Sequence, residues 1–193
     1  MIFIGDQRIK LEKPLNDLDR LVLRFVNILK KHVDYVIISG YVSLLLGRTR
    51  NTEDVDVYIH YLEFNPLSSL FLNLCQDGFE CLNTNNVKEI YDYLNEGLAV
   101  RFALKGEVIP NFEVKFVKRI QDYDLFDEAV DVETEGGSIK ISSLERQIAF
   151  KKYYLGSPKD LEDARYVEEV AKGHLNPEKI KKYQQLVKEL MKE

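Results

Sequence analysis

The chain has 193 residues, of which 45% are hydrophobic and 31% are charged. It can therefore bury a substantial core in one compact domain, with or without a helical extension, and this composition argues against a disordered chain. The net charge of −5 argues against a generally basic coat for nucleic acids, because phosphate contacts need clustered lysines and arginines, although a local basic surface remains compatible with it.

The two cysteines and the start of the chain bear on cellular location. Cys75 and Cys81 lie in a stretch with the pattern of a helix followed by a strand, so neither a disulfide framework nor a zinc site is indicated. In residues 1–14, charged residues interrupt the apolar stretch before it is long enough for the apolar core of a signal peptide. No uninterrupted apolar run in the sequence is long enough to span a bilayer. We therefore expect a cytoplasmic protein with no membrane partner.

Helical and strand patterns alternate over the first two thirds of the chain. A helix is predicted where apolar residues recur every three or four positions, and a strand where they alternate or form a short run. In chain order the patterns predict helix 18–29, strand 35–38, a short helix at 44–46, strand 55–61, helix 65–74, strand 79–82, helix 87–94, strands 98–104 and 112–117, and a hairpin of 130–133 with 138–141.

Only helical patterns follow residue 142. Ser157-Pro158 and Asn176-Pro177 each predict the start of a helix, because proline suits the first helical position. The predicted fold is therefore α+β, with a mixed β-sheet packed with helices over residues 1–141 and a C-terminal helical extension over residues 142–193.

Strand 55–61 and the residue before it carry the most informative polar pattern. Asp54, Asp56 and Tyr58 share one face, and the apolar residues between and after them face the other way. Residues two apart on a strand point their side chains the same way with a backbone separation of about 6 to 7 Å, so the two carboxylates can share one divalent ion or flank two. Because hard cations prefer carboxylate oxygens, we expect Mg²⁺ or Mn²⁺ at Asp54 and Asp56.

The turn that precedes this strand suits a phosphate group. Ser39-Gly40 follows an apolar strand and leads into a short helix. A glycine turn of this kind offers backbone N–H groups and the positive end of a helix dipole. Ser39 and Gly40 are therefore predicted to hold the triphosphate of a nucleoside triphosphate.

Two segments resemble a known family. Residues 37–59 resemble the signature of the polymerase-β-like nucleotidyltransferase superfamily, in which Gly/Ser-Gly, a short helix and Arg-x-Thr-x-Asp-x-Asp follow one another; here the signature reads IISGYVSLLLGRTRNTEDVDVYI. Residues 142–167 are similar to the lysine-bearing helix and the Lys-Asp-x-x-Asp helix of its abortive-infection toxin-type branch, with the sequence SSLERQIAFKKYYLGSPKDLEDARYV. Together the two blocks cover under half of the chain.

The resemblance implies a third carboxylate, on a neighbouring strand, that binds metal and deprotonates the attacking hydroxyl. Glu113 is the best candidate because its apolar neighbours take the core-facing positions of strand 112–117. The competing interpretation is an exposed strand residue. Two departures from the family are glutamate where aspartate is commoner and Ser39 where glycine is more usual, the latter a mild change.

Each remaining site residue has a structural interpretation beside the functional one. Arg50 and Thr52 either bind phosphate or shield the acidic strand by ion pairing and hydrogen bonding. Lys151 either reaches the triphosphate, as the resemblance implies, or lies on a solvated helix face. Asp160 and Asp163 are interpreted as structural, since carboxylates in the first turn stabilise a helix dipole.

The resemblance implies a Mg²⁺-dependent nucleotidyltransferase that transfers a nucleoside monophosphate from a triphosphate to a hydroxyl. The expected acceptor is RNA, including the 3′ end of tRNA, or a partner protein, and an antitoxin is a further expected partner in a toxin–antitoxin or abortive-infection system. The rival hypothesis is a non-catalytic nucleotide-binding or protein-interaction module that retains the fold with an incomplete metal site.

Overall fold

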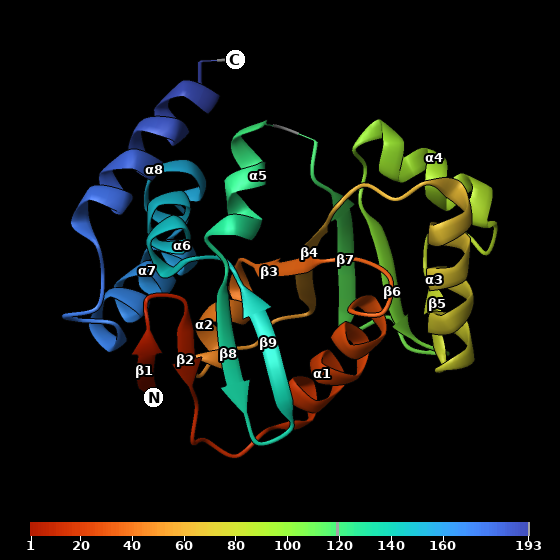
Figure 1. The fold of residues 1–193 in the computed structure, drawn as a ribbon, viewed down its shortest axis with the longest axis horizontal. Coiled ribbons are helices and arrows are strands. Elements are labelled where there is room, and N and C mark those ends of the chain that lie inside the picture. Colours follow the sequence, from red (N-terminus) through yellow and green to blue (C-terminus); the bar gives the residue numbers. More distant parts are fainter. Residues whose placement is uncertain (119, 193) are drawn as a thin grey trace.

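The computed structural model describes residues 1–118 and 120–192, and in this part of the chain nine strands form one mixed sheet (Figure 1). The strands are β1 (Ile2–Gly5), β2 (Arg8–Lys10), β3 (Tyr35–Ile38), β4 (Asp54–Ile59), β5 (Phe79–Cys81), β6 (Val100–Leu104), β7 (Asn111–Phe116), β8 (Val130–Thr134) and β9 (Gly137–Ile141). Their order across the sheet is β1-β2-β8-β9-β3-β4-β7-β6-β5.

Helices pack on the sheet and extend beyond it (Figure 1). The helices are α1 (Asp17–Leu29), α2 (Gly40–Leu45), α3 (Phe64–Gln76), α4 (Val87–Glu96), α5 (Ile120–Asp127), α6 (Leu144–Phe150), the π-helix η1 (Lys151–Leu155), α7 (Pro158–Val170) and α8 (Pro177–Leu190). The predicted α+β class, with a mixed sheet followed by a helical C-terminal part, is confirmed. No helix within the described residues has the length and apolarity needed to cross a membrane.

Every predicted strand is present, with small shifts at the ends. Strand 98–104 begins only at Val100, because Gly97 ends α4 in the left-handed conformation and the Leu98 N–H donates to the Tyr93 carbonyl. This arrangement is a common way for a helix to end. The chain enters the sheet only after this helix end, so the strand starts at Val100.

Four elements were not predicted from the sequence: β1, β2, α5 and η1. The strand β2 pairs in parallel with β8, and its Ile9 is almost completely buried. A strand of three residues carries little periodicity of its own. It forms here because β8, from a distant part of the chain, supplies the hydrogen-bonding partner.

The two faces of the central strands pack against different helices. Val55, Val57 and Ile59 of β4 are buried and join one hydrophobic core that includes residues of α1, α3 and α4. The ring of Phe25 from α1 stacks on Phe112 of β7 with centroids 3.9 Å apart. The opposite face carries Asp54, Asp56 and Tyr58 and lies toward α5 and α6 (Figure 1).

The C-terminal helices contribute to the same core as the sheet. Leu144 and Ile148 of α6 and Val167 of α7 are buried members of that cluster. The helix α6 packs extensively against α8 and α7, and α7 also packs against α2. The helical part therefore lies over the residues that follow β3 and precede β4, while the domain boundary at residue 142 stays a prediction.

Candidate active site

The sheet brings the three predicted carboxylates to one face. Strands β4 and β7 pair in parallel, with Asp56 opposite Glu113 and Asp54 opposite Asn111. Asp54 is exposed, whereas Asp56 and Glu113 are half-buried. The predicted alternation along β4 is confirmed, and the topology places Glu113 beside Asp56, as the third carboxylate would require.

Asp56 lies in an electrostatic environment that suits a divalent cation. Burial, followed by the negative charges of Asp54 and Glu113, raises the pKa of Asp56 to about 6. Lys115 and a hydrogen bond with the Ser39 side chain act in the opposite direction. Because the negative charges of Asp54 and Glu113 act on Asp56, a Mg²⁺ bound at Asp54 and Asp56 would relieve the repulsion, and the carboxylate oxygens of these two residues suit such an ion.

Glu113 is held by two cations. It lies 2.8 Å from the ammonium of Lys115 and 3.3 Å from the guanidinium of Arg101. Burial alone would raise the pKa of Glu113, but hydrogen bonds and positive charge from Lys115 and Arg101 outweigh it and lower the pKa. In the described residues no three acidic, histidine or cysteine side chains converge as a preformed metal site. Glu113 is therefore held by ion pairs and is not part of a three-carboxylate metal site in this arrangement.

Ser39 adopts a backbone conformation that favours glycine. Its φ of 64° and ψ of −134° make it, among the described residues, the sole non-glycine residue with positive φ. Such a conformation costs on the order of 1–3 kcal/mol, so serine in place of glycine is not the mild change that the sequence suggests. The side chain of Gln147 stabilises the turn: its Oε1 accepts from the Ser39 N–H at 3.2 Å and its Nε2 donates to the Ser39 carbonyl.

The helix that follows this turn is short. It covers only six residues, Gly40–Leu45, so its dipole adds little to phosphate binding. Gly40 itself has a helical backbone and no positive φ. Its lack of a side chain matters for space, because a Cβ atom there would lie 3.0 Å from Nη2 of Arg50.

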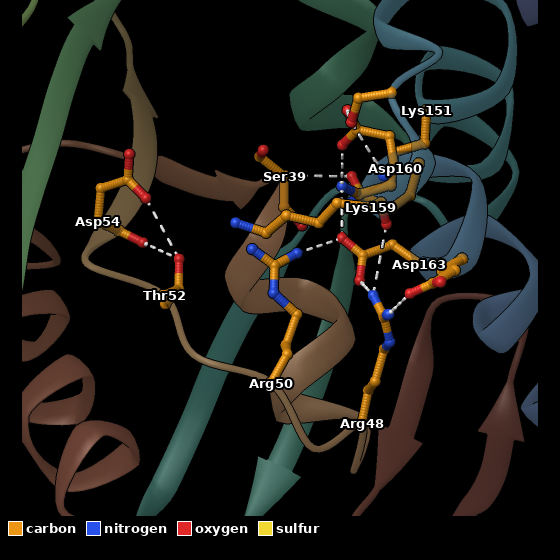
Figure 2. A network of polar contacts seen from close by, with 12 residues as sticks. Ser39, Arg48, Arg50, Thr52, Asp54, Lys151, Lys159, Asp160 and Asp163 are labelled. Carbon is orange, nitrogen blue, oxygen red and sulfur yellow. Dashed lines mark hydrogen bonds and ion pairs between the residues drawn. The ribbon is translucent and has the colours of Figure 1, made fainter.

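Thr52 and Arg50 have different partners. The Thr52 hydroxyl lies 3.2 Å from Oδ1 of Asp54 and 3.0 Å from its backbone carbonyl, which corresponds to the shielding alternative for Thr52. Arg50 instead forms an ion pair with Asp163 of α7 (Figure 2). Arg50 therefore connects the loop before β4 to the C-terminal helices.

Lys151 lies in a buried ionic network rather than on a solvated face. Its ammonium lies 2.9 Å from Asp160 and 2.7 Å from Asp163, and the residue is 1% exposed (Figure 2). Asp160 lies in the first turn of α7, as predicted, and accepts from Lys151. The first-turn interpretation of Asp163 is wrong, because Asp163 lies beyond that turn and is completely buried.

A cavity of about 290 Å³ adjoins Asp56. Its walls include Ser39 and Asp56 on one side and Phe150, Lys151 and Tyr154 from α6 and η1 on the other. Mixed apolar walls with a few polar groups are typical of small-molecule sites, and π-helices are frequent at functional sites. A second cavity of about 450 Å³ shares Phe150 and Tyr154 with the first.

Three residues of this region were not predicted from the sequence. Gln147 supports the Ser39 turn, and Arg101 and Lys115 hold Glu113. Lys115 stands two residues after Glu113, so strand alternation already places it on the same face. Gln147 stands four residues before Lys151, which places both on one side of a helix. Arg101 has no comparable sequence signal, because its position depends on the pairing of β6 with β7.

Comparisons with known proteins bear on the fold. No protein-family model matches the sequence, and no curated protein is similar to it in sequence. Among solved structures, the chain is similar to an antigenic nucleotidyltransferase-like protein from Paracoccidioides brasiliensis, with 19% identity, a TM-score of 0.51 and coverage of 93% of this chain and 92% of the other.

The chain is also similar to two structures of the antibiotic-resistance factor ANT(2″)-Ia. The solution structure has 15% identity, a TM-score of 0.54 and coverage of 92% of this chain and 95% of the other. The crystal structure in complex with adenylyl-2″-tobramycin has 15% identity, a TM-score of 0.53 and coverage of 89% and 97%. Identities this low are informative about the fold alone, and they agree with the sheet described above: the chain has a nucleotidyltransferase fold.

Proposed function

We propose that the protein is a Mg²⁺-dependent nucleotidyltransferase that transfers a nucleoside monophosphate from a nucleoside triphosphate to a hydroxyl group. The observation that carries this proposal is the register of β4 and β7, which places Glu113 beside Asp56 and next to Asp54. This acidic face adjoins the cavity of about 290 Å³. One neighbour of the same fold was solved with adenylyl-2″-tobramycin, which is consistent with nucleotidyl transfer.

Each carboxylate has a role in the proposed reaction. Asp54 and Asp56 hold the divalent cation, which when bound neutralises charge on the phosphate oxygens. Glu113 accepts the proton of the acceptor hydroxyl. The hydroxyl oxygen then forms a bond with the α-phosphorus, the bond from that phosphorus to the bridging oxygen breaks, and pyrophosphate leaves with the electron pair.

The proposed nucleotide position follows from the walls of the cavity. Ser39 lines the triphosphate side, with Arg50 packed against the adjoining Gly40, whereas the rings of Phe150 and Tyr154 offer flat surfaces on which a base can stack. Lys151 contributes less than the sequence suggests, since its ammonium already pairs with two carboxylates. The base that is selected depends on these walls.

The acceptor and biological role rest on the resemblance to the abortive-infection toxin-type branch. It supports RNA as the acceptor, with the tRNA 3′ end as the first candidate and a partner protein as the second. It also supports a role in a toxin–antitoxin or abortive-infection system with an antitoxin partner. The second cavity, which shares Tyr58 and Lys115 with the first, offers room for an acceptor beside Lys115, the ion-pair partner of Glu113.

The direct test offers the purified protein each α-³²P-labelled triphosphate in turn, with Mg²⁺ and either total RNA or a cell extract. Transfer to RNA is expected, abolished by Asp54→Asn/Asp56→Asn. Label on protein would favour the second acceptor. The absence of labelling in every reaction, with RNA and extract from the source cell included, would contradict the proposed activity.

One observation favours the alternative of a non-catalytic binding module. Glu113 is paired with Arg101 and Lys115, and no described carboxylate trio forms a preformed metal site. A module would bind a triphosphate through the cavity without transferring any part of it. Metal-dependent triphosphate binding without transfer to any acceptor would support this alternative.

A further inference from the structure

The network around Asp163 joins two segments that lie far apart in the sequence (Figure 2). Asp163 Oδ1 accepts from Arg48, and Asp163 Oδ2 accepts from Arg50 and from Lys151. The carboxylate is completely buried, and burial of a carboxylate is costly unless cations compensate it. Three cations compensate it here, so Asp163 determines where their side chains lie.

Arg50 is the member of this network that packs against the Ser39-Gly40 turn, whereas Lys151 lines the cavity. Nη1 pairs with Asp163 and Nε lies 3.3 Å from the Asn51 carbonyl. Nη2 makes no hydrogen bond to any residue in the described part of the chain, although the side chain is only 10% exposed. A guanidinium carries five N–H donors, and a donor without an acceptor in the protein can bind an anion.

The unpaired side of Arg50 points at the turn that precedes the acidic strand. Nη2 would lie 3.0 Å from a Cβ atom on Gly40, so the guanidinium packs directly against the backbone of the turn. The negative charge of Asp54 also acts on Arg50. Nη2 therefore lies against the Ser39-Gly40 turn and within electrostatic reach of Asp54, where it can bind a phosphate of a metal-bound triphosphate.

We infer that Asp163 is a positioning residue: by pairing with Arg50, it holds the guanidinium in the orientation that binds the triphosphate. This inference rests on the proposed nucleotidyltransferase function. Asp163 does not contact the nucleotide in this arrangement, because it lies behind Arg50 and is completely buried. Gly40 supports the same arrangement by leaving space for Nη2.

Calorimetric titration of Mg²⁺ with ATP, CTP, GTP and UTP tests the inference, using the triphosphate that wild type binds tightest. Arg50→Gln and Asp163→Asn should each weaken binding at least about tenfold, because a charge-assisted hydrogen bond to phosphate is lost or misdirected. The double variant Arg50→Gln/Asp163→Asn should bind less than about twofold more weakly than Arg50→Gln alone, because both substitutions act through one guanidinium.

Glu162→Gln is the matched control. Glu162 stands next to Asp163 on α7 and pairs with Arg48 but not with Arg50. Its substitution should leave triphosphate affinity within about twofold of wild type. Far-ultraviolet circular dichroism and the melting temperature of each variant show whether it is folded at the temperature of the titration.

Gly40→Ala provides a second route if Asp163→Asn does not fold. The added methyl group should displace the Arg50 guanidinium and weaken binding at least about fivefold, without changing any charge. In the Arg50→Gln background the same methyl group should cost little, because the shorter side chain leaves room for it.

The outcomes separate the inference from the function on which it rests. If wild type binds none of the four triphosphates with Mg²⁺, the proposed function fails and the inference fails with it. If wild type binds and folded Asp163→Asn binds equally well, the inference alone fails. It also fails if the effect of Asp163→Asn disappears in Lys151→Gln but persists in Arg50→Gln, because Asp163 would then act through Lys151.

Discussion

The acidic cluster on β4 and β7 and the ionic network around Asp163 are built from the same residue types and behave in opposite ways. In the first, Asp54 is exposed and Asp56 lies beside two other acids. In the second, Asp163 is completely buried and every carboxylate oxygen accepts from a cation. The loop between α2 and β4 links the two regions: its Arg48 and Arg50 pair with Asp163, and it leads into Asp54 at the start of β4.

The difference shows how burial decides what a charged cluster can do. At the open face Glu113 is paired with Lys115 and Arg101. Asp54 and Asp56, however, can remain without an ion pair, because water screens them until a cation binds. A carboxylate in the core must be paired at all times, so its partners become fixed in position. The open cluster therefore suits chemistry, while the buried network suits the placement of the groups around it.

The largest expected effect is on stability, from Asp163→Ala. Removal of the carboxylate leaves Arg48, Arg50 and Lys151 close together without their shared partner. Breaking a buried ionic network in this way costs about 3–5 kcal/mol. Urea unfolding should show that loss, whereas Glu162→Ala, with a side chain 63% exposed, should change the free energy of unfolding by less than about 0.5 kcal/mol.

A loss of about 1 kcal/mol or less for Asp163→Ala would remove the contrast between the two regions. It would mean that water or a local rearrangement compensates the three cations as well as the carboxylate does. In that case the network would be adaptable, and the positions of Arg50 and Lys151 would not depend on it.

The next effect is on ligand binding, from Asp54→Asn/Asp56→Asn. A triphosphate with Mg²⁺ at a hundred times its dissociation constant stabilises a folded protein by about 2.7 kcal/mol. Thermal unfolding of wild type should show a corresponding rise in melting temperature, and the double variant should show almost none. Equal stabilisation of both proteins would place the ligand elsewhere.

The strand β8 offers a matched control for that experiment. Asp131 and Glu133 have the same acid-x-acid spacing as Asp54 and Asp56. They lie on a strand flanked by β2 and β9 and line no cavity next to Ser39. Asp131→Asn/Glu133→Gln should therefore retain the full metal-dependent rise in melting temperature.

Glu113→Gln sharpens the assignment of roles within the acidic cluster. Glutamine has a similar volume but cannot accept the proton of the acceptor, so single-turnover transfer should fall about a hundredfold or more while triphosphate affinity changes far less. A parallel loss of affinity would identify Glu113 mainly as a metal ligand. Unchanged transfer would exclude it from the site.

The smallest expected effect comes from Ser39→Gly. Glycine adopts a φ of 64° without strain, and relief of the strain, less the greater entropy of the unfolded chain, should stabilise the protein by about 1 kcal/mol. Urea unfolding measures the change. A destabilised variant would show that the interaction of the Ser39 side chain with Asp56, which lowers the pKa of Asp56, outweighs the backbone strain.

Much of the fold and half of the candidate site are local properties of the sequence. The alternation in β4 places Asp54 and Asp56 on one face whatever the rest of the chain does. The starts of α7 and α8 follow from Ser157-Pro158 and Asn176-Pro177, whose side chains cap the helices as expected. These features depend on neighbours within a few residues, so their periodicity and capping are visible without a structure.

Only the tertiary structure decided which distant groups meet. The strand β2 forms because β8 pairs with it, Glu113 lies beside Asp56 because β7 pairs with β4 in one register, and Asp163 is buried because α7 packs over α2. A carboxylate has the same local sequence pattern whether it faces water or three cations. Burial and pairing are set by the packing of segments far apart in the chain, so the role of Asp163 was not visible from the sequence.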